Sequence, residues 1–167
     1  MNTETQDIVK KRISDFMEKG CKGYLNLERL GLTEIPELPK NTQYLWIQGN
    51  KIKHIHTLPQ SLDVLHISNN EIEYISTDLP ENLSNLFISK NKLQCLPYLP
   101  DSLDILDISY NNIHTLPNIP RNMELLFCWG NPVPRELIER SDPIFCDIFE
   151  CHEDRIKLWK KFLKQPC

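Results

Sequence analysis

The stretch from Leu62 to Ile72, L-D-V-L-H-I-S-N-N-E-I, recurs as L-D-I-L-D-I-S-Y-N-N-I from Leu103 to Ile113. Aligning the chain on this frame places five asparagines 20 or 21 residues apart, at Asn50, Asn70, Asn91, Asn111 and Asn131. Self-similarity at a fixed short period predicts a stack of equivalent coils. A coil of this length cannot bury its own apolar face, so its stability must come from contact with neighbouring coils.

The predicted strand of each coil carries two aliphatic columns, two residues apart, and further aliphatic columns follow where the chain turns around the core. Residues two apart lie on the same side of an extended strand, so these columns predict the buried side of a short strand. The first column is Leu25, Leu45, Leu65, Leu86, Leu106 and Leu126, and the second is Leu27, Ile47, Ile67, Ile88, Ile108 and Cys128.

The other half of each coil holds prolines, as in I-P-E-L-P at 35–39 and L-P-Y-L-P at 96–100. Proline lacks a backbone donor and fixes its own φ, so we expect extended or polyproline II backbone here and no helix. In every coil but the first, which has Leu30 at this place, an asparagine precedes this half, at a tight turn. Its amide can donate and accept, so we expect a structural ladder of asparagines that satisfies buried backbone groups.

The unit L-x-x-L-x-[LI]-x-x-N-x-[IL]-x-x-[IL]-P-x-[LI]-P resembles the leucine-rich repeat, in the short subtype of bacterial effectors of the YopM and IpaH kind. The resemblance covers roughly residues 22–134. It implies an α/β repeat solenoid, an arc with a parallel concave sheet and an extended or polyproline convex side. It also implies a protein ligand, without identifying it.

The two ends read as helical caps at 1–21 and 135–167, flanking repeats at 22–134. An amphipathic helix is predicted over 5–19, with Val9, Ile13, Phe16 and Met17 on one face and Gly20 after its end. In bacterial effectors a comparable segment also guides export. A second helix is predicted from about residue 142, either packing on the last coil or, through 142–164, contacting a membrane surface or a partner.

The net charge of −4 falls on the repeats, where residues 22–131 carry eight basic and twelve acidic side chains. Phosphate recognition needs the opposite sign, so we expect no nucleic acid partner. No apolar stretch approaches the ~20 residues that span a bilayer, and the N-terminus lacks an apolar signal core. We therefore expect a cytoplasmic protein, in the host cytoplasm if it is an effector. We also expect a monomer.

The six cysteines include no C-x-x-C pair, which argues against zinc. We expect them as free thiols in a reducing compartment, or with a Cys146–Cys151 or Cys151–Cys167 disulfide in an oxidising one. No G-x-S-x-G, Gly-rich phosphate loop or metal-spaced histidine set occurs, and the Cys-x-Asp of the IpaH ligase domain has no counterpart. We expect no enzymatic activity and no cofactor or metal.

Side chains alternate across a strand, so residues between the buried columns face the concave surface. Packing within a coil does not require aromatic rings there, and exposed rings are common anchors for partners. The predicted protein-binding residues are Tyr24, Tyr44, Trp46, His66, Phe87, Asp107, Phe127 and Trp129, with Tyr110 at the margin.

Six strands at ~4.8 Å spacing and five residues at ~3.3 Å give a footprint of about 450 Å². A standard interface uses roughly 800 Å² on each partner. The concave face therefore suits a peptide or a single helix, and the predicted function is a non-catalytic adaptor or effector-like interaction module. The alternatives are a regulatory or assembly subunit that docks through its caps, and peripheral membrane binding by the C-terminal helix.

Overall fold

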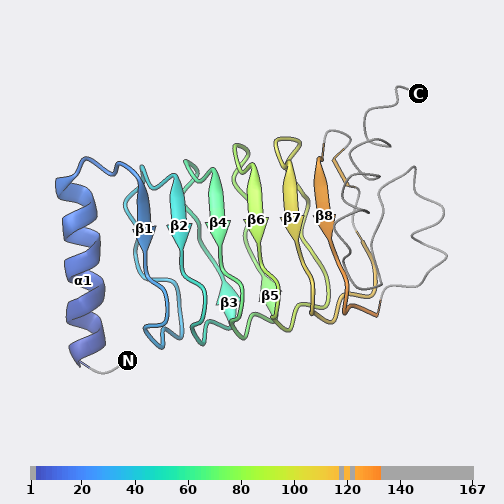
Figure 1. The fold of residues 1–167 in the computed structure, drawn as a ribbon, viewed down its shortest axis with the longest axis horizontal. Coiled ribbons are helices and arrows are strands. Elements are labelled where there is room, and N and C mark those ends of the chain that lie inside the picture. Colours follow the sequence, from blue (N-terminus) through green and yellow to red (C-terminus); the bar gives the residue numbers. More distant parts are fainter. Residues whose placement is uncertain (1–2, 117–118, 121–122, 133–167) are drawn as a thin grey trace, which may run out of the picture.

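The computed structural model describes residues 3–116, 119–120 and 123–132. The chain forms a solenoid of stacked coils with a parallel sheet along one side and a helix at its N-terminal end (Figure 1). The predicted repeat solenoid and its N-terminal helical cap are thus confirmed. The predicted C-terminal helical cap, 135–167, lies outside the described residues.

Helix α1 spans Thr3–Glu18 and buries Val9 and Phe16. The N–H of Gly20 bonds to the carbonyl of Met17 at 2.9 Å, and that of Cys21 bonds to the carbonyl of Phe16 at 3.0 Å. These are the two bonds of a Schellman motif, and Gly20 has the positive φ, 67°, that such a stop requires. Met17, predicted on the buried face, is 57% exposed, because the stripe that contacts the core runs through Val9, Ile13 and Phe16.

Six short strands form the main sheet, and every neighbouring pair is parallel and in register. Each strand buries its central residue and leaves the flanking two more accessible. In sheet order the strands are β1 (Tyr24–Asn26), β2 (Tyr44–Trp46), β4 (Val64–His66), β6 (Asn85–Phe87), β7 (Ile105–Asp107) and β8 (Leu125–Phe127).

A second sheet of two strands lies on the return side of the coils. It pairs β3 (His54–Ile55) with β5 (Tyr74–Ile75) in parallel. The sequence predicts extended backbone here, and these two coils bring that backbone close enough to pair. His54 and His56 flank the buried Ile55 in this segment.

The core runs along the inside of the stack. Both predicted columns are buried in every coil, from Leu25 at 1% exposure to Cys128 at 2%. A third buried column, Leu32, Ile52, Ile72, Leu93 and Ile113, turns each coil around this core. The hydrophobic pattern therefore fixes which side of each strand is inside.

The asparagine amides bond to backbone groups of two successive coils. Asn50 donates to the carbonyls of Leu27 and Ile47 at 2.9 and 2.8 Å, and its Oδ1 accepts from the N–H groups of Leu30 and Leu32. The same arrangement recurs one coil at a time. Each later asparagine donates from Nδ2 to the carbonyl three residues back and to the carbonyl 23 or 24 residues back, and its Oδ1 accepts from one N–H of the preceding coil. These asparagines are Asn70, Asn91, Asn111 and Asn131.

One position in each coil has left-handed backbone, with φ between 53° and 70°. It follows the strand and turns the chain toward the asparagine. Two coils use glycine, which has no Cβ to oppose this conformation. The column is Arg29, Gly49, Asn69, Lys90, Tyr110 and Gly130.

Three further expectations concern the membrane, the cysteines and the end of the chain. Among the described residues, no helix is long and apolar enough to cross a bilayer. Cys21 and Cys95 carry free thiols, whereas Cys128 is disulfide-bonded, so the expectation of free cysteines does not hold throughout. The helix predicted from residue 142 stays a prediction.

Candidate functional site

The outward-pointing side chains of the six-stranded sheet form one continuous surface, which we call the sheet face. All eight residues predicted to bind protein lie on this face or directly after its strands. Tyr24 is 59% exposed and the other seven are half-buried. The set is Tyr24, Tyr44, Trp46, His66, Phe87, Asp107, Phe127 and Trp129.

Four of these rings form a connected row across β1, β2, β4 and β6. Tyr24 meets Trp46 edge-on at a centroid distance of 4.5 Å. Trp46 and His66 are stacked at 5.4 Å with planes 6° apart, and His66 and Phe87 are stacked at 4.0 Å and 16°. In-register strands about 4.8 Å apart make this stacking possible. Because the stacked faces of Trp46, His66 and Phe87 cover one another, these three rings are half-buried and their edges stay accessible.

The row is interrupted at β7, where Asp107 takes the ring position. Its Oδ1 accepts a 3.0 Å bond from the N–H of Ser109, so this carboxylate holds the turn after its own strand. Asn26 does the same at the other end, accepting from the N–H of Glu28 at 3.0 Å. Beyond the break, Phe127 and Trp129 form a separate edge-on pair at 5.1 Å.

His66 is held neutral by its place in the row. Burial lowers the pKa of this imidazole below its ordinary value, outweighing the carboxylates of Glu28 and Asp107, which raise it. The middle of the row is therefore uncharged near neutral pH, and its stacking is that of three neutral rings.

A polar column runs beside the ring row, and sequence reasoning assigned it no role. Ser89 donates to Ser68 at 3.1 Å. The Oε1 of Gln48 and the Oγ of Ser109 are buried without a hydrogen-bond partner among the described residues. Buried polar groups are normally satisfied, so these two atoms mark places where the sheet face lacks a bonding partner.

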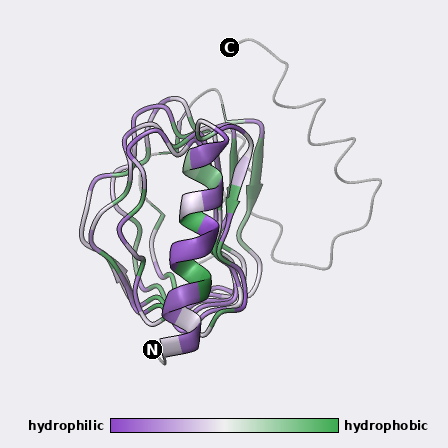
Figure 2. Ribbon diagram, turned by 90° about the vertical axis from the view of Figure 1, so that its left-hand side faces the viewer, coloured by the Kyte–Doolittle hydropathy of each residue, from purple (hydrophilic) through white to green (hydrophobic). Residues whose placement is uncertain are grey.

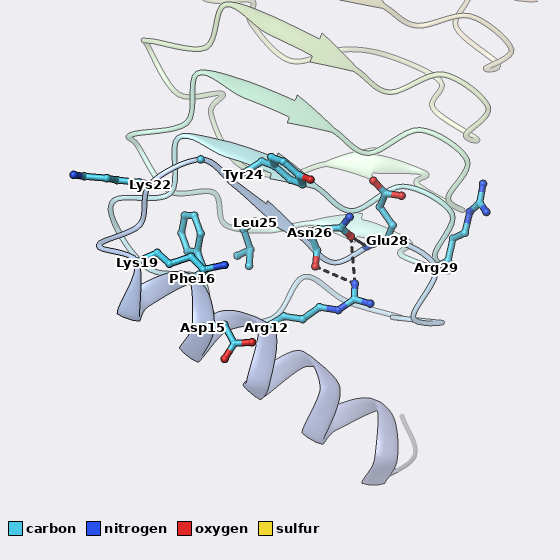
Figure 3. Close-up of a pocket in the computed structure, with 11 residues that line it drawn as sticks. Arg12, Asp15, Phe16, Lys19, Lys22, Tyr24, Leu25, Asn26, Glu28 and Arg29 are labelled. Atoms are coloured by element: carbon cyan, nitrogen blue, oxygen red, sulfur yellow. Dashed lines mark hydrogen bonds between the residues drawn. The ribbon is translucent and has the colours of Figure 1, made fainter.

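A pocket of about 580 Å³ lies between α1 and β1 (Figure 3). Arg12 reaches across it from the helix and donates from Nη1 to the backbone carbonyl and the Oδ1 of Asn26, at 3.1 and 3.2 Å. Tyr24, Asn26 and Glu28 line the pocket and also belong to the sheet face, so the two surfaces are continuous. Neither repeat pattern nor motif predicts this pocket, because it depends on where α1 docks.

A candidate metal site is absent from the part of the chain that the structure describes. No group of three or more His, Cys, Asp or Glu side chains is placed to hold a metal ion there. The two return-side histidines instead contact Tyr74: the ring of His54 stacks on it at 4.1 Å, and the ring of His56 meets it edge-on at 6.2 Å. His56 Nδ1 also lies 2.8 Å from Ser76 Oγ.

Comparison with known proteins supports the repeat assignment. The leucine-rich-repeat family profile matches residues 61–86 and 102–123. No curated protein matches the sequence.

Solved structures are similar over most of this chain. A Shigella effector leucine-rich-repeat domain aligns with a TM-score of 0.72 and 31% identity, covering 76% of this chain and 57% of that domain. YopM from Yersinia pestis, a leucine-rich effector protein, aligns with a TM-score of 0.73 and 33% identity, covering 79% of this chain and 37% of that chain. YopM from Yersinia enterocolitica aligns with a TM-score of 0.63 and 27% identity, covering 78% of this chain and 34% of that chain.

The chain therefore spans little more than half the length of the Shigella domain and about a third of each YopM chain. Within the aligned part, these proteins share the stacked coils and the sheet described above. The chain is thus built of leucine-rich repeats, and its repeat region is similar to those of a Shigella effector and of YopM.

Proposed function

We propose that the chain is a non-catalytic, effector-like or adaptor-like interaction module that binds a protein or peptide segment on its sheet face. Leucine-rich repeats are typical of protein-interaction modules, and the similar solved structures are effectors. The proposal extends to a monomer that acts in a cytoplasm and uses no cofactor.

The observation that carries the proposal is the ring row Tyr24–Trp46–His66–Phe87. It crosses four adjacent strands through unbroken ring contacts of 4.0 to 5.4 Å. The coils are already closed by their aliphatic columns and asparagine bonds, so the row is not needed to hold them together. Half-buried rings that are already ordered lose little conformational entropy on binding, which suits them as anchors.

The shape of the row favours a particular kind of ligand. Ring faces carry negative charge density and ring edges carry positive density. Since the stacked rings present their edges, oxygen atoms of a peptide are better complements than another flat ring.

The test is capture of partners from the native cell by the full chain and by two double variants. Trp46→Ser with Phe87→Ser removes two rings of the row. Tyr74→Ser with Tyr98→Ser is the matched control, because both tyrosines are exposed and lie off the sheet face.

We expect the wild type and the control to retain a protein that the Trp46/Phe87 variant loses. Retention by the Trp46/Phe87 variant, with loss on deletion of residues 141–167, would contradict it and favour docking through the C-terminal segment. Liposome association that requires Trp159 would favour the membrane alternative.

A further inference from the structure

We infer that the pocket between α1 and β1 receives an acidic side chain or an acidic segment of the protein that binds the sheet face. This inference rests on the proposed function and deepens it, because it specifies the charge of the partner and its direction across the sheet. Its evidence is the charge of the pocket, the state of the β1 edge and the opposite charge of the far strands.

The charged residues of the pocket are mostly basic. Four cations face two carboxylates: Arg12, Lys19, Lys22 and Arg29 against Asp15 and Glu28. The described residues contain one ion pair, Lys92–Glu71, which lies elsewhere. None of the four pocket cations is therefore neutralised at ion-pair distance by a described carboxylate, and a net positive potential remains at this end of the sheet.

The cations lie along β1 and on the helix that faces it. Figure 3 shows Lys22 before the strand, Arg29 beyond its other end, and Arg12 between them on α1. This spread matches an extended acidic segment better than a single small anion. The guanidinium of Arg12 is held by its two bonds from Nη1 to Asn26, so the cation nearest the sheet is ordered before a ligand arrives.

The edge of β1 is not free to add another strand. The Asn26 carbonyl accepts from Arg12, and the Glu28 N–H bonds to Asn26 Oδ1. Capped edge groups of this kind prevent strand addition. A ligand in the pocket is therefore recognised by the charge of its side chains and not by its backbone.

The rest of the sheet face has the opposite charge. In coils three to six, the segments from one residue before each strand to three residues after it carry four carboxylates and the single cation Lys90. The carboxylates are those of Asp63, Asp104, Asp107 and Glu124. An acidic segment is repelled from that half and attracted to the α1 end. The Tyr24–Trp46 contact joins the pocket to the ring row, so one ligand can reach both.

The inference is tested on the full chain with labelled hexaglutamate, by fluorescence anisotropy at low salt. The variant Lys19→Gln with Lys22→Gln removes two exposed pocket cations. Lys51→Gln with Lys53→Gln is the matched control, because it makes the same change in net charge at two exposed lysines of coil two.

We expect the pocket variant to weaken hexaglutamate binding about fivefold or more and the control to weaken it less than about twofold. Equal weakening by both variants, or no saturable binding by the wild type, would overturn the inference. Tighter binding of hexauridylate than of hexaglutamate would also overturn it, because the pocket would then prefer phosphate to carboxylate.

The same titration separates this inference from the proposed function. Trp46→Ser with Phe87→Ser tests the proposed function through its cellular partner, whereas the lysine variants test the pocket through hexaglutamate. If that variant loses its cellular partner while the lysine variants bind hexaglutamate alike, the sheet-face proposal stands and the pocket inference fails. If Lys19→Gln with Lys22→Gln weakens hexaglutamate binding more than its control does, but no cellular partner depends on Trp46 and Phe87, the pocket inference stands and the sheet-face proposal fails.

Discussion

Two columns of the same coils, the asparagines and the rings, recur with the same period but make different kinds of contact. Each asparagine bonds to backbone of its own coil and of the coil before, and Asn50, Asn70 and Asn111 are buried. The rings of Trp46, His66 and Phe87 contact each other and are half-buried. A repeated residue therefore has to be judged by its bonds, since repetition alone does not separate stability from binding.

The largest expected effect is on the asparagine column. Asn111→Ala leaves the N–H of Leu93 and the carbonyls of Ile88 and Ile108 without their side-chain partner. Each unsatisfied buried group costs about 1–3 kcal/mol, so we expect the free energy of unfolding to fall by about 3 kcal/mol. Urea denaturation measures this.

The neighbouring residue provides the control for that variant. Asn112 is exposed, and Asn112→Ala should change the free energy of unfolding by less than about 0.5 kcal/mol. Similar losses for the two variants would show that the buried amide bonds do not hold the coils together.

The second effect concerns the left-handed position between the two columns. At Gly130, with φ of 70°, an added Cβ would lie 2.7 Å from Cδ1 of Tyr110. For comparison, Gly31, which lies two residues beyond this position in the first coil, has a φ of 68° and no atom within 4 Å of such a Cβ. We expect Gly31→Ala to cost about 1 kcal/mol through backbone strain and Gly130→Ala to cost about 2 kcal/mol.

Thermal unfolding of the two alanine variants gives this difference. Adding Tyr110→Ala to Gly130→Ala should bring its cost back toward that of Gly31→Ala. If the double variant is no more stable than Gly130→Ala alone, the ring contact is not the cause.

The third effect is of opposite sign, and it tests the polar column beside the rings. Ser109 Oγ is buried and unpaired, so Ser109→Ala should leave the free energy of unfolding unchanged or raise it by up to about 1 kcal/mol. Ser89→Ala, which loses a bond to Ser68, should lower it by about 0.5 kcal/mol. A clear loss from Ser109→Ala would mean that its hydroxyl stabilises the fold.

The smallest effect is the pH dependence of the ring row. Burial lowers the pKa of His66 in the fold, so as pH falls below the ordinary value near 6.5 the unfolded chain takes up the proton first. Stability is therefore lost from about pH 6.5 down to the folded pKa and does not change further below it, while above pH 6.5 His66 contributes nothing.

His66→Phe keeps a ring in the row and removes the titration. Its urea midpoint, compared at about pH 7.5 and about pH 5.5, should fall less than that of the wild type. Equal falls would assign the pH dependence to other groups.

The sequence predicts the repeat architecture well, because burial follows directly from the period. Leu65 and Ile67 are inside for the same reason in every coil, since slipping by one residue would expose both. It also predicts that rings such as Trp46 lie on the sheet face. It does not predict that they stack, because stacking depends on side-chain rotation between strands 20 residues apart.

Features that arise from contact between distant segments are beyond the sequence pattern. The pairing of β3 with β5 requires two return segments to come close, and extended-chain signals do not show this. The bond from Arg12 to Asn26, and with it the pocket, depends on how α1 docks on the first coil. Figure 2 shows this helix lying across the end of the stack, with hydrophilic and hydrophobic residues interspersed along it.

The most direct test of the central claim is a calorimetric titration of the captured partner against three proteins. These are the wild type, Trp46→Ser with Phe87→Ser, and Tyr74→Ser with Tyr98→Ser. If the ring row is the binding site, the Trp46/Phe87 variant binds at least about 100-fold more weakly, because two anchor residues are each worth about 2 kcal/mol or more, and the control binds like the wild type. Wild-type affinity in the Trp46/Phe87 variant would contradict the account.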